Sequence, residues 1–175
     1  MEGKIILNLA ISIDGFIADE DGGFDWIKGD LDNSLDTEKK FDFSKFLEGI
    51  DVVLMGKRCY EQNFHKDFTN KEVYVATSED LKDYDNIHFI KGNIVEKMEI
   101  LKKSGKNIFL FGGGVVIDPF IKEDIIDIYI IGMIPTILGK GRSLFLKDNP
   151  KIDLHLDEYT SESGIVILKY SKRTI

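Results

Sequence analysis

The chain has almost no cysteine, because Cys59 is the single one among 175 residues. One thiol cannot form an internal disulfide, so an apolar core rather than cross-links has to hold the fold together. The sequence also shows no basic region followed by an apolar run and a cleavage site, the pattern of a secretory signal peptide. We therefore expect a cytoplasmic protein.

Long hydrophobic runs are also missing. The longest apolar region, "IIDIYIIGMIPTIL" from Ile125, is interrupted by Asp127, Gly132 and Pro135 and is too short to span a bilayer. It is typical of a long buried strand, and we expect no membrane partner. With 43% hydrophobic residues, the chain is long enough to bury a core of its own, which predicts one domain over residues 1–175.

Net positive charge and metal-binding patterns are absent as well. The net charge of −8 argues against a phosphate-backbone footprint, so nucleic acid is not an expected partner. The three histidines, His65, His88 and His155, have no metal-ligand spacing, and no G-x-S-x-G motif occurs. We expect neither a metal site nor a serine triad.

Apolar runs instead alternate with helical patterns along most of the chain, and the last two runs form a hairpin pattern around Ser161 to Gly164. Strands are expected at 4–13, 51–55, 72–78, 87–90, 107–111, 125–135, 151–160 and 164–172. Helices are expected at 37–50, with Thr37 as its cap, at 58–64, at 94–105 and from Val115. About eight strands and four helices predict an α/β fold with a mainly parallel sheet and an antiparallel C-terminal hairpin.

Three consecutive glycines, Gly112 to Gly114, stand between an apolar strand and an amphipathic helix. One interpretation is a tight turn that needs positive φ, and the other is a ligand that approaches the main chain too closely for a Cβ atom. Ligands of open α/β sheets bind at the carboxyl ends of the strands, where this chain also has Gly56–Arg58 and Thr77–Ser78. Basic and hydroxyl groups in that position favour a phosphate-bearing nucleotide over the alternative of a solvated helix start.

The order of these segments resembles bacterial dihydrofolate reductase-like proteins, close to the reductase domain of the bifunctional riboflavin-biosynthesis deaminase/reductase. The resemblance rests on "NLAISIDGFIA", "VVLMGKRCYE", "VYVATS" and "IFLFGGGVVIDPFIKEDIIDIYIIGMIPTILGKGRSLF". Lys57 and Cys59 stand where the family has Arg and Thr. The resemblance implies a three-layer dihydrofolate reductase-like fold, NADPH as cofactor and a homodimer, formed through the strand from Ile125 or the C-terminal hairpin.

The resemblance also implies the residues that bind the cofactor. Ala10 would border the nicotinamide, Gly56, Lys57 and Arg58 would meet phosphates, and Thr77 and Ser78 would flank the adenosine 2′-phosphate. The main chain of Gly112, Gly113 and Gly114, continued by Val115 and Val116, would pass beneath the nicotinamide and pyrophosphate. A cis peptide bond is expected between Gly112 and Gly113.

The substrate side is less defined. The carboxylate that folate reductases carry on their first helix falls on Lys40 by ungapped alignment, and Asp42 is the alternative catalytic group. Asn8 lies on the same strand face as Ala10 and would reach the substrate, and Trp26 would close over it or anchor its own loop. Lys140 and Arg142 would meet a substrate phosphate or lie in a solvated loop.

Three functions remain open from the sequence. The first is an NADPH-dependent reductase of a heterocyclic or ribosylamino-pyrimidine-type small molecule. The second is dihydrofolate reduction, and the third is a nucleotide-binding protein on the same fold without turnover.

Overall fold

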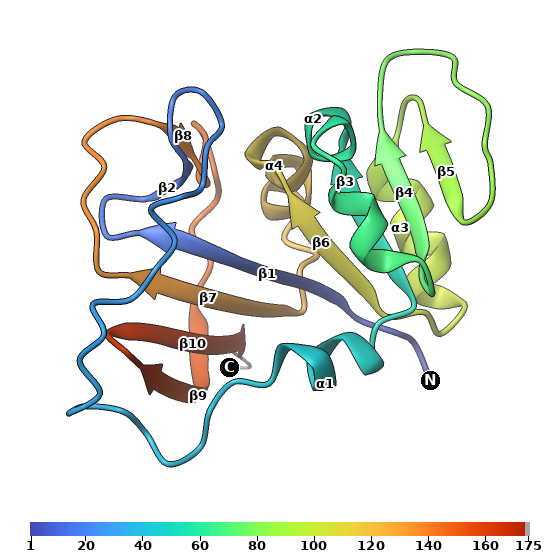
Figure 1. The fold of residues 1–175 in the computed structure, drawn as a ribbon. Coiled ribbons are helices and arrows are strands. Elements are labelled where there is room, and N and C mark those ends of the chain that lie inside the picture. Colours follow the sequence, from blue (N-terminus) through green and yellow to red (C-terminus); the bar gives the residue numbers. More distant parts are fainter. Residues whose placement is uncertain (174–175) are drawn as a thin grey trace.

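The computed structural model describes residues 1–173 and contains one eight-stranded sheet with the strand order β5-β4-β3-β6-β1-β7-β10-β9. Figure 1 shows this order from β5 at the right to β9 at the lower left. The strands are β1 (Ile5–Ser12), β2 (Phe16–Ala18), β3 (Val52–Gly56), β4 (Glu72–Ala76), β5 (Ile87–Ile90), β6 (Ile108–Gly112), β7 (Ile128–Ile134), β8 (Arg142–Ser143), β9 (Leu154–Glu162) and β10 (Ile165–Lys172). The helices are α1 (Phe43–Glu48), α2 (Lys57–Glu61), the 3-10 helix η1 (Phe64–Phe68), α3 (Ile94–Lys103) and α4 (Gly114–Lys122).

The sheet is parallel from β5 to β7, and β10 pairs antiparallel with both β7 and β9. This arrangement confirms the predicted α/β class with its antiparallel C-terminal hairpin. Ser163 and Gly164, both at positive φ, make the tight connection of that hairpin. Successive residues of a strand point to opposite faces, so helices have to cover both sides of a sheet whose central strands are apolar throughout.

Each face of the sheet has its own core. Ile5 and Leu7 of β1 pack with α3 and α4 on one face, where Met98 and Phe120 are fully buried. On the opposite face, Ile6 packs with residues of α1 and η1 in a second cluster. Full burial of one such side chain stabilises the fold by roughly 1.5–3 kcal/mol. The result is a three-layer molecule with the sheet in the middle.

Helix α1 is shorter than the predicted helix over 37–50. It begins at Phe43, where the carboxylate of Asp42 accepts a hydrogen bond of 2.9 Å from the backbone N–H of Lys45. Thr37, the predicted cap, is tied to β9 instead, because its hydroxyl accepts a 2.9 Å bond from the N–H of Ser161. Residues 37–42 are therefore irregular chain, bent at 38–39 and bonded to the hairpin, and the predicted helix does not include Lys40 and Asp42.

A second, two-stranded sheet of β2 and β8 was not predicted. It orders part of the long loop after β1, and Asp14 supports it from the end of β1. The Asp14 carboxylate accepts bonds from Ser12 Oγ at 2.7 Å and from the N–H groups of Leu138 and Gly139. The hydrogen bond from Ser12 has the largest effect on the pKa of Asp14 and lowers it below its usual value, and the two backbone N–H groups lower it further. Asp14 thus fixes the loop before β8 at the end of β1.

Within residues 1–173, no helix has both the length and the apolar character that a membrane crossing requires.

Candidate functional site

The carboxyl ends of four neighbouring strands bring the predicted cofactor residues to one edge of the sheet. Because β4, β3 and β6 are adjacent and parallel, the residues that follow them lie at one edge of the sheet, and β1, next to β6, runs on past this edge beside β7 (Figure 1). We call this region the strand-end edge. It contains Gly56–Arg58, Thr77–Ser78, Gly112–Gly114 and the end of β1 beyond Ala10.

The three glycines of the strand-end edge have different surroundings. The bond between Gly112 and Gly113 is cis, as expected, and Gly112 has a φ of +139°. Apart from the adjacent residues in the chain, a Cβ atom on Gly112 or Gly113 would have no atom of the described residues within 4 Å, whereas one on Gly114 would lie 2.6 Å from the carbonyl oxygen of Ser143. The first two glycines border open space, and the third allows close packing of α4 against β8.

Gly114→Ala is therefore expected to destabilise the fold. The added methyl group has to displace the Ser143 carbonyl, which belongs to backbone rather than to a flexible side chain. Overpacking of this kind costs about 1–3 kcal/mol, and thermal unfolding monitored by circular dichroism would show a midpoint lowered by several degrees. A midpoint equal to that of the unmodified protein would contradict this packing.

Helix α4 begins directly at the glycines and has no side-chain cap. Its cap residue, Gly113, has no side chain to bond the N–H groups of the first turn. Free N–H groups and the helix dipole favour an anion at this position.

Val115 is 80% exposed, but Val116 is buried, and its Cγ2 atom would be 3.1 Å from a Cβ on Gly56. Val116 thus packs α4 against the end of β3.

The basic residues after β3 differ in their partners. Lys57 forms ion pairs with Glu79 and, at 3.4 Å, with Glu61. The hydrogen bond to Glu79 raises the pKa of Lys57, so the ammonium group stays charged. Arg58 is exposed. Glu79 lies just after the predicted Thr77–Ser78 pair, and its backbone N–H donates a 3.1 Å bond to Thr77 Oγ1.

Lys140 and Arg142 are held by the loop between β2 and Trp26. Lys140 Nζ lies 2.6 Å from a carboxylate oxygen of Glu20, and Arg142 Nη2 donates a 3.5 Å bond to the Glu20 carbonyl. Arg142 Nη1 also lies against Gly22, 2.7 Å from where a Cβ atom on that residue would be, and the Gly22 carbonyl accepts a 3.5 Å bond from Gln62 Nε2 at the end of α2. The structure thus places Arg142 near the end of α2.

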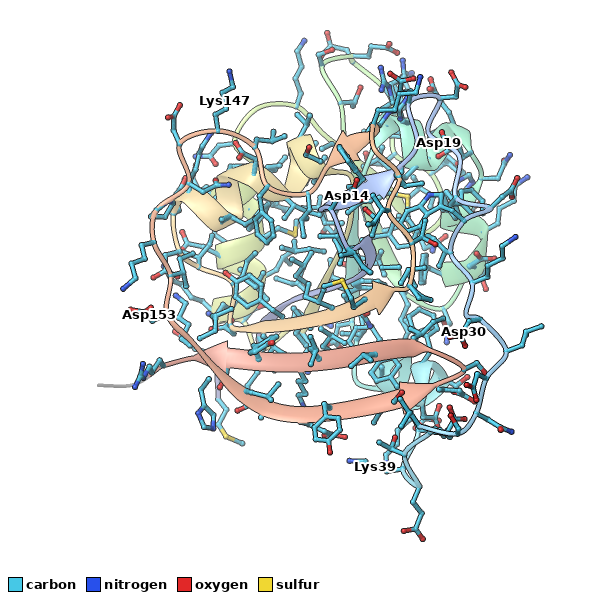
Figure 2. The ribbon with its side chains drawn as sticks, turned by 90° about the vertical axis from the view of Figure 1, so that its left-hand side faces the viewer. Asp14, Asp19, Asp30, Lys39, Lys147 and Asp153 are labelled. Carbon is cyan, nitrogen blue, oxygen red and sulfur yellow. The ribbon has the colours of Figure 1, made fainter. Side chains whose placement is uncertain are left out.

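A cavity of about 470 Å³ lies on the sheet face that carries Asn8 and Ala10, between the chain segment 39–46 and the strands β7, β10 and β9. We call it the lysine-lined cavity. Figure 2 shows Lys39 beside the β9–β10 hairpin. Its lining consists of Lys39, Lys40, Phe41, Asp42, Lys45, Phe46, Ile130, Glu158, Thr160, Ile167 and Lys169.

The strand register connects this cavity with the predicted substrate residue Asn8. Asn8 pairs with Ile130, Ile130 with Lys169, and Lys169 with Glu158, so the four side chains form one row on one face. The Asn8 Nδ2 atom is buried and has no hydrogen-bond partner among the described residues. The next row runs from Ala10 and Gly132 to Ile167 and Thr160, and the last two of these line the cavity.

Asp42 and Trp26 have local structural contacts. Asp42 lines the cavity while one of its carboxylate oxygens caps α1. Trp26 Nε1 donates a 3.3 Å bond to the carbonyl of Gly23, and neighbouring Phe24 stacks against Phe64 with ring centroids 5.5 Å apart. Trp26 does not line the cavity, and these contacts fit the second of its two predicted roles, the anchoring of its own loop.

Sequence reasoning missed Glu79 and most of the lysine-lined cavity. The alternation of Glu158 with Thr160 and of Ile167 with Lys169 was a usable signal, because each pair shares one face of the hairpin. The segment that covers that face is distant in sequence.

Residues 1–173 contain no cluster of His, Cys, Asp or Glu suited to a metal ion.

Relatives of this chain are similar over most of its length. The family model of the RibD C-terminal domain matches residues 61–166. The uncharacterized protein YwjB of Bacillus subtilis (strain 168) is 35% identical over 83% of this chain and 84% of its own length. The uncharacterized protein YyaP of the same organism is 31% identical over 95% of this chain and 94% of its own length.

Solved structures share the fold. A protein from Shewanella sp. PV-4 superposes with a TM-score of 0.81 at 25% identity and covers 99% of this chain and 100% of its own. The deaminase/5-amino-6-(5-phosphoribosylamino)uracil reductase of Thermotoga maritima gives 0.68 at 16% identity, over 98% of this chain and 57% of its own. Dihydrofolate reductase from Enterococcus faecalis, complexed with NADP(H), gives 0.64 at 15% identity over 99% of both chains.

The glycine turn, the strand order and these matches agree, and the chain belongs to the RibD C-terminal domain family.

Proposed function

We propose that this protein is a reductase that binds a reduced nicotinamide dinucleotide along the strand-end edge and a small acceptor in the lysine-lined cavity. The observation that carries the proposal is the open space at Gly112 and Gly113, at the uncapped start of α4 and one strand away from Asn8. NADPH is the donor that the family resemblance implies, and the E. faecalis reductase with its bound NADP(H) supports it.

The residues of the strand-end edge fit such a dinucleotide. Gly112 and Gly113 leave room where any Cβ would project, and the first turn of α4 favours a diphosphate group. Arg58 is exposed and Arg142 lies near the end of α2, so these two residues are the proposed guanidinium partners of the phosphates. When bound, a reduced nicotinamide supplies a hydride, and the protein supplies its orientation.

The lysine-lined cavity fits the acceptor. Ile130 of β7 lines it, and Asn8, the neighbour of Ile130 on β1, offers a buried amide donor beside it. A hydrogen-bonding heterocycle with a carbonyl or ring nitrogen satisfies this donor, which supports an acceptor of the ribosylamino-pyrimidine type. The T. maritima protein, named as a uracil-derivative reductase, is the comparison that favours this class.

Asp42 is the proposed proton donor, and two variants separate that role from helix capping. Asp42→Asn keeps a good cap, so we expect an unchanged melting temperature and a kcat lowered on the order of 100-fold. Asp42→Ala loses the cap as well and should cost about 1 kcal/mol of stability. Steady-state kinetics and thermal unfolding measure both quantities, and full activity of the Asn variant would remove Asp42 from the chemistry.

A binding protein without turnover is the second candidate, favoured by the engagement of Asp42 as a helix cap. The test has two stages. Quenching of Trp26 fluorescence reports binding of NADPH and NADH. Loss of dinucleotide absorbance then reports turnover with dihydrofolate or with 5-amino-6-(5-phosphoribosylamino)uracil. Binding without oxidation favours the second candidate, oxidation with dihydrofolate favours folate reduction, and the absence of binding contradicts both nucleotide functions.

We also propose a cytoplasmic homodimer. β7 is paired on both sides, so it has no free edge for a second chain, whereas β9 is an outer strand of the sheet. Leu156 and Tyr159 are exposed on β9 and supply apolar area there. Light scattering after size-exclusion chromatography measures the mass, and a monomer at micromolar concentration would contradict the proposal.

A further inference from the structure

The positions of the cavity and of the strand ends decide which end of a bound dinucleotide lies where. The lysine-lined cavity lies over β7, β10 and β9, on one side of β1. The residues after β3 and β4 lie on the other side of β1, beyond β6. Hydride transfer needs the nicotinamide ring against the acceptor. An extended dinucleotide therefore has its nicotinamide near β1 and its adenosine near the ends of β3 and β4.

At the adenosine end, the ammonium group of Lys57 is already engaged by carboxylates, whereas Arg58 is exposed. Lys57 pairs with both Glu79 and Glu61, so one ammonium group faces two carboxylates. Glu79 is held in place by the bond from its backbone N–H to Thr77 Oγ1. The next residue, Asp80, is occupied by Lys91 at 2.8 Å and does not contact Lys57.

Such a site treats the two nicotinamide dinucleotides differently. A 2′-phosphate brings about two negative charges and has to take Lys57 from Glu79 while lying close to that carboxylate. A 2′-hydroxyl donates a hydrogen bond to a carboxylate, which is how acidic residues recognise the unphosphorylated ribose in other nucleotide-binding folds.

We propose that Glu79 selects the cofactor, so that the protein binds NADH at least as tightly as NADPH. This inference rests on the proposed function, because it assumes that a reduced dinucleotide binds along the strand-end edge. It departs from the NADPH that the resemblance implies, and the departure comes from the Glu79 carboxylate, which pairs with Lys57 directly after the Thr77–Ser78 pair expected to flank the 2′-phosphate.

Calorimetric titration of NADH and NADPH into the wild-type protein, Glu79→Gln and Asp80→Asn tests the proposal. Glu79→Gln removes the charge but keeps the side-chain size, and we expect it to tighten NADPH binding about tenfold and to weaken NADH binding about twofold. Asp80→Asn is the matched control. It removes the same charge at the next residue, where the carboxylate pairs with Lys91. Its ratio of NADPH to NADH affinity should stay within about twofold of wild type.

Two results would overturn the role of Glu79 and leave the proposed function intact. The first is wild-type protein that binds NADPH more tightly than NADH, and the second is an affinity ratio that Glu79→Gln leaves unchanged. If neither dinucleotide binds to any of the three proteins, the proposed function fails, and the selection by Glu79 fails with it.

Discussion

Gly113→Ala is expected to weaken dinucleotide binding about 100-fold while the protein remains folded. Among residues 1–173, no atom beyond the two chain neighbours lies within 4 Å of the added Cβ atom, and Gly113 has a φ of −86°, which other residues adopt readily. The free protein therefore has room for the methyl group. A ligand that passes over the main chain at this point does not, because the methyl group projects into the space that the ligand needs.

Gly114→Ala is the matched control for this prediction. The two positions are adjacent and receive the same methyl group, but only at Gly114 does the group meet backbone, the Ser143 carbonyl at 2.6 Å. We expect Gly113→Ala to change the calorimetric Kd and not the melting temperature, and Gly114→Ala to lower the melting temperature. Dinucleotide affinity within about threefold of wild type in Gly113→Ala would show that the ligand does not approach the main chain there.

Asn8→Leu is expected to raise stability and to lower turnover. Asn8 Nδ2 is buried and has no partner within residues 1–173, and an unsatisfied buried donor costs about 1–3 kcal/mol, which a leucine of similar size removes. The same amide is the donor that the acceptor would satisfy. Its loss should lower kcat/KM for the acceptor by about 100-fold, because the acceptor's own polar group then remains unpaired in the cavity.

Two measurements check the Asn8 prediction, and one internal control accompanies them. Thermal unfolding should show a higher midpoint, and steady-state kinetics a lower kcat/KM. Dinucleotide affinity should not change, because Asn8 lies beside Ile130 of the cavity rather than at the glycines. A variant of lower stability would mean that Asn8 contributes to the core, and unchanged kcat/KM would place the acceptor elsewhere.

The sequence was sufficient to locate the strand-end edge, because its position follows from a simple rule about parallel strands. Carboxyl ends of adjacent parallel strands meet at one edge, so recognising the strands that end at Gly56, Ala76 and Gly112 also locates the residues that follow them. It did not separate the roles of the three glycines. The space around a Cβ atom differs between Gly113 and Gly114 because the Ser143 carbonyl lies next to Gly114. Three identical residues in the sequence do not predict that contact.

Other features depend on contacts that a local pattern does not contain. The apolar spacing at Phe43 and Phe46 indicated α1, but its start was misplaced because Thr37 bonds to Ser161, more than a hundred residues away. The pairing of β2 with the two-residue strand β8 is too short to produce a periodic signal, and this pairing decides where Arg142 lies. The lysine-lined cavity depends on the register of β7, β10 and β9, which sequence alone leaves open.

A calorimetric titration of the wild-type protein with NADH and with NADPH tests the central claim most directly. The strand-end edge predicts one site per chain with a Kd in the micromolar range for at least one of the two dinucleotides, and the loss of that binding in Gly113→Ala. The absence of binding heat with both dinucleotides at millimolar concentration would contradict the claim that this edge is a nucleotide site.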